Sequence, residues 1–469
     1  MGRAKWTSPF PTLQLSREDA ERIEQLALLL VHKNLAQYEM HLGCGRGVVD
    51  ERKWKFMRQR ENVRVFAERR RWRKPKSRTT ASDSHREHHW GPLVERRLPP
   101  PESSSTSVQQ PSPTPSDASS SSGFESTQAS AALPVIHVVG SVEGTLDDIV
   151  YGILNPSLDV MRIKTAYIHV NLADIAVLET LAVPTLASPF QSLTIKWVVS
   201  SQKLLLRPAV NNRDFIYIEA TGVTHTIAGE RVGFHLLHSV HFPQTYALEG
   251  LVRGNMSACG LYRQKPDNPN EVDVFFKGVL DPGGLAMRSL VVIAAVDVFI
   301  AIWKYVECSR LKKLAWLMRT RSQRCVSSAT GDSDELSASS ASGILTPRGL
   351  KGQQCVACSR PPVVRVLSGL RQRRCSLCFK YVCSSCKVRK TLCHLTAAEA
   401  KLLQREFAFC PACYESAIRA DAFEIAQQEF AALDAYAFSS ELFTSTNSES
   451  SSRRSRFSSI GSLADSLFS

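Results

Sequence analysis

The sequence predicts an α+β protein in which a curved antiparallel sheet wraps around a C-terminal helix, followed by a small cysteine-rich module and interrupted by long disordered segments. Three observations predict it. Strand-like runs follow one another from about residue 165 to 280, a long apolar helix comes directly after them, and nine of the 13 cysteines fall between Cys355 and Cys413. Strands at this spacing, separated by turn residues, are typical of an antiparallel sheet.

Composition divides the 469 residues into folded and disordered segments. Tracts dominated by Ser, Thr and Pro cannot bury enough apolar surface to offset the entropy of ordering. We expect the sheet domain over 12–78 and 134–318, a disordered insertion over 79–133, a disordered linker over 319–352, the cysteine-rich module with a C-terminal helix over 353–438, and a disordered tail over 439–469.

The first folded segment predicts a helix and a strand hairpin. Ser16 followed by Asp19 is a helix-start signal, and apolar residues recur at helical spacing through 23–30. Alternating apolar residues in 54–56 and 63–66 predict two short strands that pair as a hairpin.

After the insertion, the sequence predicts a strand, a helix and then most of the sheet. PVIHVVGSV is the strand, and Thr145 is the expected N-cap of the helix, with Asp147 and Asp148 in its first turn. The strand-like runs that follow are DIAVLETL, SLTIKWVVS, FIYIEATGV, VGFHLLHSVHF, ACGLYRQK and VDVFFKGVL.

The last helix of this domain is apolar on nearly every side from Leu285 to Trp303. Such a helix is buried either in protein or in a membrane. Asp297 in its middle would cost about 3 kcal/mol in lipid on insertion scales. We therefore favour a helix buried by the sheet.

A sheet curled around a helix need not close fully, and the gap becomes an apolar cavity. We expect Val291, Ala294 and Val298 to line it together with Asp297. Two interpretations of Asp297 stay open: a polar group of the cavity, or a satisfied buried pair. Its possible partners on the strands are Arg231, His235 and His238.

Short sequence motifs within this domain resemble those of a known family. They are the Trp54-Lys55 strand opening, Arg213-Asp214 before FIYIE, the run GFHLLHSVHFP, and the DPGG turn before the last helix. With the order of elements, they resemble a START-type lipid-binding domain over 15–78 and 134–318. The resemblance implies a helix-grip fold that holds one lipid beneath the C-terminal helix.

The cysteine-rich module contains four Cys-x-x-Cys pairs. The opening residues MGRAKWTSPF lack the apolar core of a signal peptide, so we expect these cysteines to bind metal rather than to form disulfides. Zn²⁺ takes four thiolates in a tetrahedron, so four pairs predict two zinc ions. The second and third pairs lie too close in sequence to form one site easily. An interleaved arrangement follows, with Cys355, Cys358, Cys383 and Cys386 on one ion and Cys375, Cys378, Cys410 and Cys413 on the other; Cys393 and His394 are spare.

This cysteine spacing resembles a FYVE-type finger, and a START-like domain before such a finger resembles the START–FYVE-related proteins of oomycetes. The family binds phosphatidylinositol 3-phosphate through a basic stretch before the third cysteine. Arg371 matches its leading arginine, whereas Arg373 and Arg374 replace two histidines, so the family's histidine-based pH dependence is not expected. A W-x-x-D motif is missing before Cys355, and FAFC replaces the family's R-V-C, so the finger is a degenerate one.

The same residues suggest membrane contact without the family. Clustered arginines suit phosphate, and the adjacent apolar lip of Val366, Leu367 and Leu370 suits a bilayer interface. The alternative is a solvated basic face beside residues of the module's own core.

Charge is concentrated in two basic islands. The net charge is +14, and residues 51–78 and 351–390 each contribute about +10. The run at 68–78 suits a nuclear signal or nucleic-acid patch, a solvated linker, or contact with anionic lipid. We favour the linker and do not expect nucleic acid as a partner.

Together these features predict a non-enzymatic lipid-binding or lipid-transfer protein. The sheet domain would shelter a lipid, and the zinc finger would dock on a phosphoinositide-containing membrane, placing the protein in the cytoplasm, peripheral on endosomal or similar membranes. No nucleophile–base group, P-loop or dinucleotide fingerprint is present in the sequence. The alternatives are a RING-like ubiquitin ligase and a protein-binding scaffold with a filled sheet domain. The sequence leaves the oligomeric state and the identity of the lipid open.

Overall fold

The structure is a computed structural model of the 469-residue chain. It describes residues 8–44, 47–69, 133, 135–200, 212–284, 288–327, 354–361, 374–395 and 402–443. The chain divides into two compact units, Met1–Arg69 with Pro134–Ser469, and Arg70–Leu133. The folded elements all belong to the first unit, so the sheet domain and the cysteine-rich module form one unit. Most of the predicted insertion, of the basic run at 68–78, of the predicted linker and of the predicted tail lies outside the described residues, whereas 319–327 of the linker and 439–443 of the tail are helical.

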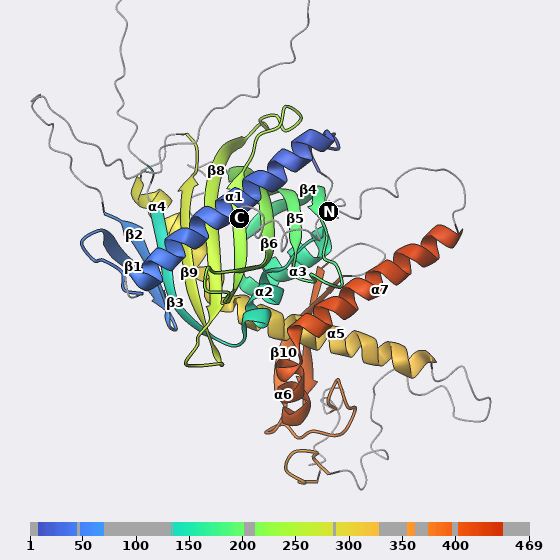
Figure 1. The fold of residues 1–469 in the computed structure, drawn as a ribbon. Helices are drawn as coiled ribbons and strands as arrows, with labels where there is room; N and C mark the ends of the chain where they lie inside the picture. Colours follow the sequence, from blue (N-terminus) through green and yellow to red (C-terminus); the bar gives the residue numbers. More distant parts are fainter. Residues whose placement is uncertain are drawn as a thin grey trace, which may run out of the picture. The chain divides into compact units, whose positions relative to one another are not determined.

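One nine-stranded sheet dominates the fold (Figure 1). Its strand order is β1-β2-β3-β9-β8-β7-β6-β5-β4, and adjacent strands are antiparallel. The strands are β1 (Trp54–Arg60), β2 (Val63–Glu68), β3 (Val135–Glu143), β4 (Leu172–Ala182), β5 (Ser192–Ser200), β6 (Asn212–His225), β7 (Arg231–Ser239), β8 (Leu251–Gln264) and β9 (Glu271–Asp281). The predicted strands, including the β1–β2 hairpin, are confirmed.

Helix α1 (Arg17–Gly43) covers one face of the sheet, as Figure 1 shows. Its first turn is capped as predicted, because the Ser16 hydroxyl accepts the N–H of Asp19 at 3.0 Å. Tyr38 packs against Phe275 with the ring centroids 5.1 Å apart, which ties the helix to β9. The face beneath α1 is therefore filled with apolar residues, and we call it the outer face.

The opposite, inner face carries helices α2 (Leu146–Ile153) and α3 (Leu158–Ile168). Thr145 caps α2 as predicted, with its hydroxyl accepting the N–H of Asp148 at 3.1 Å. Helix α3 was not predicted. Ser157 caps it. Its apolar pattern is weak in the sequence because two of the positions that face the protein interior are charged residues, Arg162 and Lys164.

The apolar helix predicted after β9 is helical but not continuous. It consists of α4 (Arg288–Phe299), the 3₁₀ segment η2 (Ile300–Lys304) and α5 (Tyr305–Ser327). The sheet holds α4 and η2 against β1, β2, β3 and β9, and α5 continues onto α2 and α3. Phe299 packs on Phe276 of β9, with the ring centroids 4.7 Å apart. The predicted α+β fold, a curved sheet that grips a C-terminal helix, is confirmed.

By length and composition, one helix of the described structure, Ser289–Arg321, is apolar enough to cross a membrane. Half of its most apolar 18-residue stretch is buried within the protein. That burial agrees with the interpretation of a helix held by the sheet.

The cysteine-rich module has a two-stranded sheet and two helices. They are β10 (Val388–Leu395), β11 (Leu402–Phe409), α6 (Pro411–Arg419) and α7 (Ala422–Phe443). The single helix predicted after Cys413 is therefore wrong. Asp421 interrupts it because its carboxylate accepts the N–H of Phe423 at 2.7 Å and so begins a new helix.

Candidate functional site

Charged side chains gather on the inner face of the sheet, in a position where apolar residues would be expected. Side chains alternate between the two faces along each strand. On β6, Ile218 belongs to the apolar layer under α1, so Glu219 lies on the inner face. Lys196 of β5 and His235 of β7 lie on the same side. All three are almost completely buried.

Glu219 is the centre of this group, which we call the Glu219 cluster: Lys164, Lys196, Glu219 and His235. One carboxylate oxygen accepts hydrogen bonds from Lys164 Nζ at 3.1 Å and from His235 Nε2 at 2.7 Å. The other oxygen accepts one from Lys196 Nζ at 2.7 Å. Lys196 also donates to the backbone and side-chain oxygens of Asn155, at 2.7 and 2.9 Å. Residues of three strands, of α3 and of the loop before it are thus linked through one carboxylate.

Burial and mutual attraction set the charges of the cluster. Burial alone would raise the pKa of Glu219, but the ammonium groups of Lys164 and Lys196 hold that pKa well below its ordinary value. Burial, opposed by the attraction of Glu219 and helped by the nearby Lys164, lowers the pKa of Lys196 to about 8. Burial likewise lowers the pKa of His235, so its imidazole is neutral. Two ammonium groups and one carboxylate leave the cluster with a net positive charge.

Three polar atoms of the inner face have no hydrogen-bond partner among the described residues: His235 Nδ1, Thr194 Oγ1 and Tyr262 Oη. His235 and Gly260 are opposite each other on β7 and β8. A Cβ atom on Gly260 would lie 2.5 Å from the Tyr262 hydroxyl, so that hydroxyl lies over Gly260. Tyr305, at the start of α5, has its ring centroid 6.0 Å from that of His235. The unpartnered atoms of His235 and Tyr262 therefore belong to adjacent strands of the inner face, and both rings lie near Tyr305 of α5.

The predicted cavity residues of α4 do not lie together. Val291 is buried, whereas Ala294 and Val298 are exposed. Asp297 forms an ion pair with Arg58 of β1. Its predicted partners are wrong, because α4 packs against β2, β3 and β9 and reaches Arg58 of the neighbouring β1, rather than packing against β7.

The three residues offered as partners of Asp297 bind other groups instead. His235 binds Glu219, His238 binds the Ser257 hydroxyl at 2.9 Å, and Arg231 binds Asp147 at 2.8 Å.

The surface of the described structure includes two open clefts. One lies at the start of α2, and the other lies between α3, β4 and β11. Neither is lined by the four predicted cavity residues.

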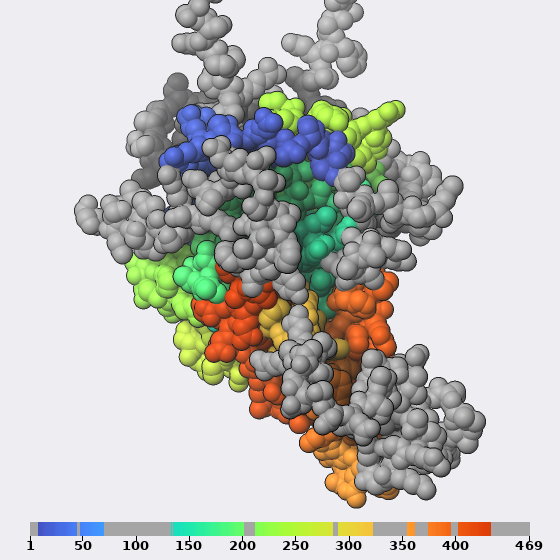
Figure 2. Space-filling model, turned by 90° about the vertical axis from the view of Figure 1, so that its right-hand side faces the viewer, coloured from blue at the N-terminus to red at the C-terminus, as the bar shows by residue number. Residues whose placement is uncertain are grey.

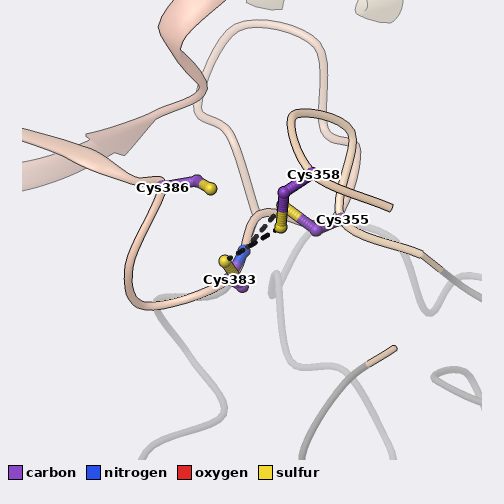
Figure 3. Close-up of side chains that lie close together, drawn as sticks. All are labelled: Cys355, Cys358, Cys383 and Cys386. Atoms are coloured by element: carbon purple, nitrogen blue, oxygen red, sulfur yellow. Dashed lines mark hydrogen bonds between the residues drawn. The ribbon is translucent and has the colours of Figure 1, made fainter. Parts of the chain in front are cut away.

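The eight paired cysteines form two tetrads in the predicted interleaved pattern. One contains Cys355, Cys358, Cys383 and Cys386, drawn in Figure 3, and the other contains Cys375, Cys378, Cys410 and Cys413. All sulfur atoms of a tetrad lie within 4.8 Å of one another. Two sulfur–sulfur distances, 3.7 Å for Cys358 to Cys383 and 3.9 Å for Cys378 to Cys410, match the ~3.8 Å edge of a tetrahedron with Zn–S bonds of ~2.3 Å.

The donor set of each tetrad fits a divalent soft metal. Burial would raise the pKa of Cys355, but backbone N–H groups, including that of Cys383 at 3.3 Å, lower that pKa to about 6. The neighbouring sulfurs of Cys383 and Cys358 raise the pKa of Cys386 to about 12. Four thiolates repel one another unless a cation lies between them, and Zn²⁺ supplies that charge. The spare Cys393 is buried in β10 and lies in neither tetrad.

Most of the predicted membrane-contacting residues lie outside the described residues. These are Arg371, Arg373, Val366, Leu367 and Leu370. Arg374 is described: its backbone bridges to Tyr381, directly before the first cysteine of the second tetrad. Phosphoinositide contact by this stretch stays a prediction.

Comparison with known proteins finds likeness in solved structures. No family model matches the sequence, and no curated protein matches it. The chain is similar to human StAR-related lipid transfer protein 5, with 13% identity, 62% of this chain and 98% of that chain covered, and a TM-score of 0.35. It is also similar to human STARD10, with 11% identity, 63% and 81% covered, and a TM-score of 0.32.

A weaker likeness is to the Zhui aromatase/cyclase of a Streptomyces species, with 10% identity, 38% of this chain and 94% of that chain covered, and a TM-score of 0.22. At these identities the likenesses say nothing about what this chain binds. The grip architecture is established by its strand order and helix packing.

Proposed function

We propose that this chain is a non-enzymatic lipid-binding protein whose grip encloses one amphipathic lipid and transfers it between membranes. The observation that carries the proposal is the Glu219 cluster with its neighbouring unpartnered atoms. A buried polar atom without a partner costs about 1–3 kcal/mol. A ligand that brings a polar group to His235 Nδ1 and Tyr262 Oη removes that cost, while its apolar part occupies the apolar interior under α4 and η2.

The charge of the cluster indicates the class of lipid. Lys164 and Lys196 carry two positive charges against the single negative charge of Glu219. An uncompensated charge in the interior is costly, so an anionic polar group such as a phosphate or a carboxylate suits this position. The cluster is enclosed by helices, and entry of a lipid requires α4 and η2 to move away from β1 and β2.

The test compares two variants that make the same chemical change on opposite faces of the sheet. Tyr262→Phe removes a hydroxyl from the inner face, whereas Tyr38→Phe removes one from the outer face under α1. We expect transfer of a fluorescent anionic phospholipid between vesicles to fall several-fold in Tyr262→Phe and to be unchanged in Tyr38→Phe. Native mass spectrometry of the wild-type chain should show one co-purified lipid. A wild-type chain that is folded but carries no lipid would contradict the proposal and favour the protein-binding scaffold.

We also propose that the cysteine-rich module holds two zinc ions and docks the protein on phosphoinositide-containing membranes, as a cytoplasmic protein peripheral on endosomal or similar membranes. Its support is the arginine-rich stretch beside the second tetrad, because guanidinium groups bind phosphate in pairs of hydrogen bonds. Arg371, Arg373 and Arg374 changed together to Ala should abolish binding to phosphoinositide vesicles while both zinc ions stay bound. Unchanged vesicle binding would refute the docking role.

A further inference from the structure

The cysteine-rich module is attached to the grip through a buried lysine of α5. Lys313 is almost completely buried, and its ammonium group donates to the backbone oxygens of Ile418 and Ala420 at 2.6 and 2.9 Å. The same group pairs with Asp148 of α2 at 2.7 Å. The carbonyls belong to the last turn of α6, where a positive charge is favoured by the helix dipole. One ammonium group thus joins α2, α5 and α6.

Strand β10 makes a second attachment. The backbone N–H of Cys393 donates to the Tyr167 hydroxyl of α3 at 2.9 Å, in a buried position. Three residues earlier, Lys390 pairs with Glu307 of α5 at 2.7 Å. The module therefore contacts both α3 and α5.

Helix α7 makes a third attachment. Phe423 packs edge-on against Phe190 in the loop between β4 and β5, with the ring centroids 5.6 Å apart. The Trp316 indole of α5 donates to Gln428 at 3.2 Å. Figure 2 shows the red surface of the C-terminal part of the chain beside the green and yellow surface of the grip. One continuous apolar cluster runs through both parts of the protein.

Two of the three attachments, those through α6 and β10, begin at or close to a cysteine of a tetrad, whereas α7 follows α6. Cys410 is the N-cap of α6, and β10 starts two residues after Cys386. In so small a module, metal binding supplies most of the folding free energy. The positions of α6 and β10 therefore depend on the two tetrads.

From these contacts we propose that the metal-loaded cysteine module clamps α5 of the grip, so that metal occupancy sets how readily α5 separates from α2 and α3. The clamp does not depend on whether the grip holds a lipid. Loss of metal releases α6 and β10, removes the α6 carbonyls from Lys313 and Lys390 from Glu307, and loosens α5 while the rest of the sheet stays folded.

The test is hydrogen–deuterium exchange on the full-length chain, with and without a zinc chelator, after native mass spectrometry has counted the bound metal. We expect chelation to speed amide exchange in α5 and α2 by about tenfold or more and to leave α1 and β8 unchanged. Faster exchange confined to residues 354–443 would overturn the clamp. Exchange that also rises in α1 and β8 would overturn it too, because the metal would then stabilise the whole fold.

Two pairs of variants separate the interface from the metal. Phe423→Ala deletes the contact with Phe190, and its control Glu424→Ala changes the adjacent, exposed residue of α7. Lys390→Met removes the pair with Glu307, and its control Arg389→Met changes a neighbour that pairs with Glu406 of its own hairpin at 3.1 Å. All four variants should keep two zinc ions. We expect faster exchange in α5 for Phe423→Ala and, more weakly, for Lys390→Met, and none for the controls; equal exchange in Phe423→Ala and Glu424→Ala would refute the clamp.

Discussion

Glu219 is the residue on which the interior of the grip depends. Its two oxygens accept hydrogen bonds from Lys164, Lys196 and His235, so a single carboxylate satisfies three buried side chains. Such a network specifies one arrangement of strands and helix, because every alternative leaves a buried charge alone.

Glu219→Gln should be among the most destabilising single changes in the chain. It leaves two buried ammonium groups without a counter-charge, and breaking a buried ion pair on one side costs about 3–5 kcal/mol. Urea unfolding measures the loss, and Glu143→Gln, at an exposed position, is the matched control. A loss below about 1 kcal/mol would show that solvent reaches the cluster.

Lys196 should make stability depend on pH in the alkaline range. Burial lowers its pKa to about 8 from an ordinary value of 10.5, so between these values the unfolded chain binds more protons than the folded chain. Stability from this group therefore rises as the pH increases from 8 to 10.5. The unfolding free energy of the wild type, measured across this range, should rise relative to that of Lys196→Met. A constant difference would mean that Lys196 keeps its ordinary pKa when folded.

At the scale of elements, helix starts were easier to predict than helix continuity. Ser16 and Thr145 act as N-caps where the sequence indicated, because a hydroxyl before a helix accepts a free N–H whatever the surroundings. The break at η2 lies within an apolar run that shows no break, whereas the break at Asp421 comes from a local cap, the Asp421 carboxylate accepting the N–H of Phe423.

The two N-caps of the inner-face helices should differ in strength. Thr145 accepts the Asp148 N–H at 3.1 Å, whereas Ser157 accepts the Val160 N–H at 3.4 Å. Thr145→Ala should therefore cost about 1 kcal/mol of unfolding free energy, and Ser157→Ala clearly less. Thermal unfolding of the two variants makes the comparison, and the reverse order would contradict it.

At the scale of the whole molecule, the two tetrads decide how the C-terminal part folds. The interleaved pairing means that each tetrad joins cysteines from distant segments, 28 residues apart for Cys355 and Cys383. This arrangement closes loops that the chain could not hold closed by itself.

Zinc counting in double variants tests that pairing. Changing Cys355 and Cys386 together to Ser removes ligands of one tetrad and should leave one zinc ion, whereas changing Cys355 and Cys378 should leave none. Pairing in sequence order would give the opposite result. Native mass spectrometry of the two proteins distinguishes them.

Much of this protein could be predicted from its sequence. Strand alternation, the two N-caps, the apolar last helix and the spacing of eight cysteines are local patterns, and local patterns specify the antiparallel sheet, the gripped helix and the metal tetrads. The Glu219 cluster was missed because a buried Lys, Glu or His inside a strand looks like a solvent-facing residue of a half-exposed strand. One signal was present: Lys196 and Glu219 interrupt runs that are otherwise apolar on both faces.

What the sequence by itself determined is therefore the strands of the large sheet, the N-caps at Ser16 and Thr145 and the chemistry of the metal ligands, since these depend on residues close together in the chain. Only the tertiary structure decided that Asp297 pairs with Arg58, that three strands and α3 meet at Glu219, and that the cysteine-rich module packs on α5 instead of moving freely. Those contacts join residues tens to hundreds of positions apart, and they form only where the curvature of the sheet and the packing of its helices bring them within hydrogen-bond distance.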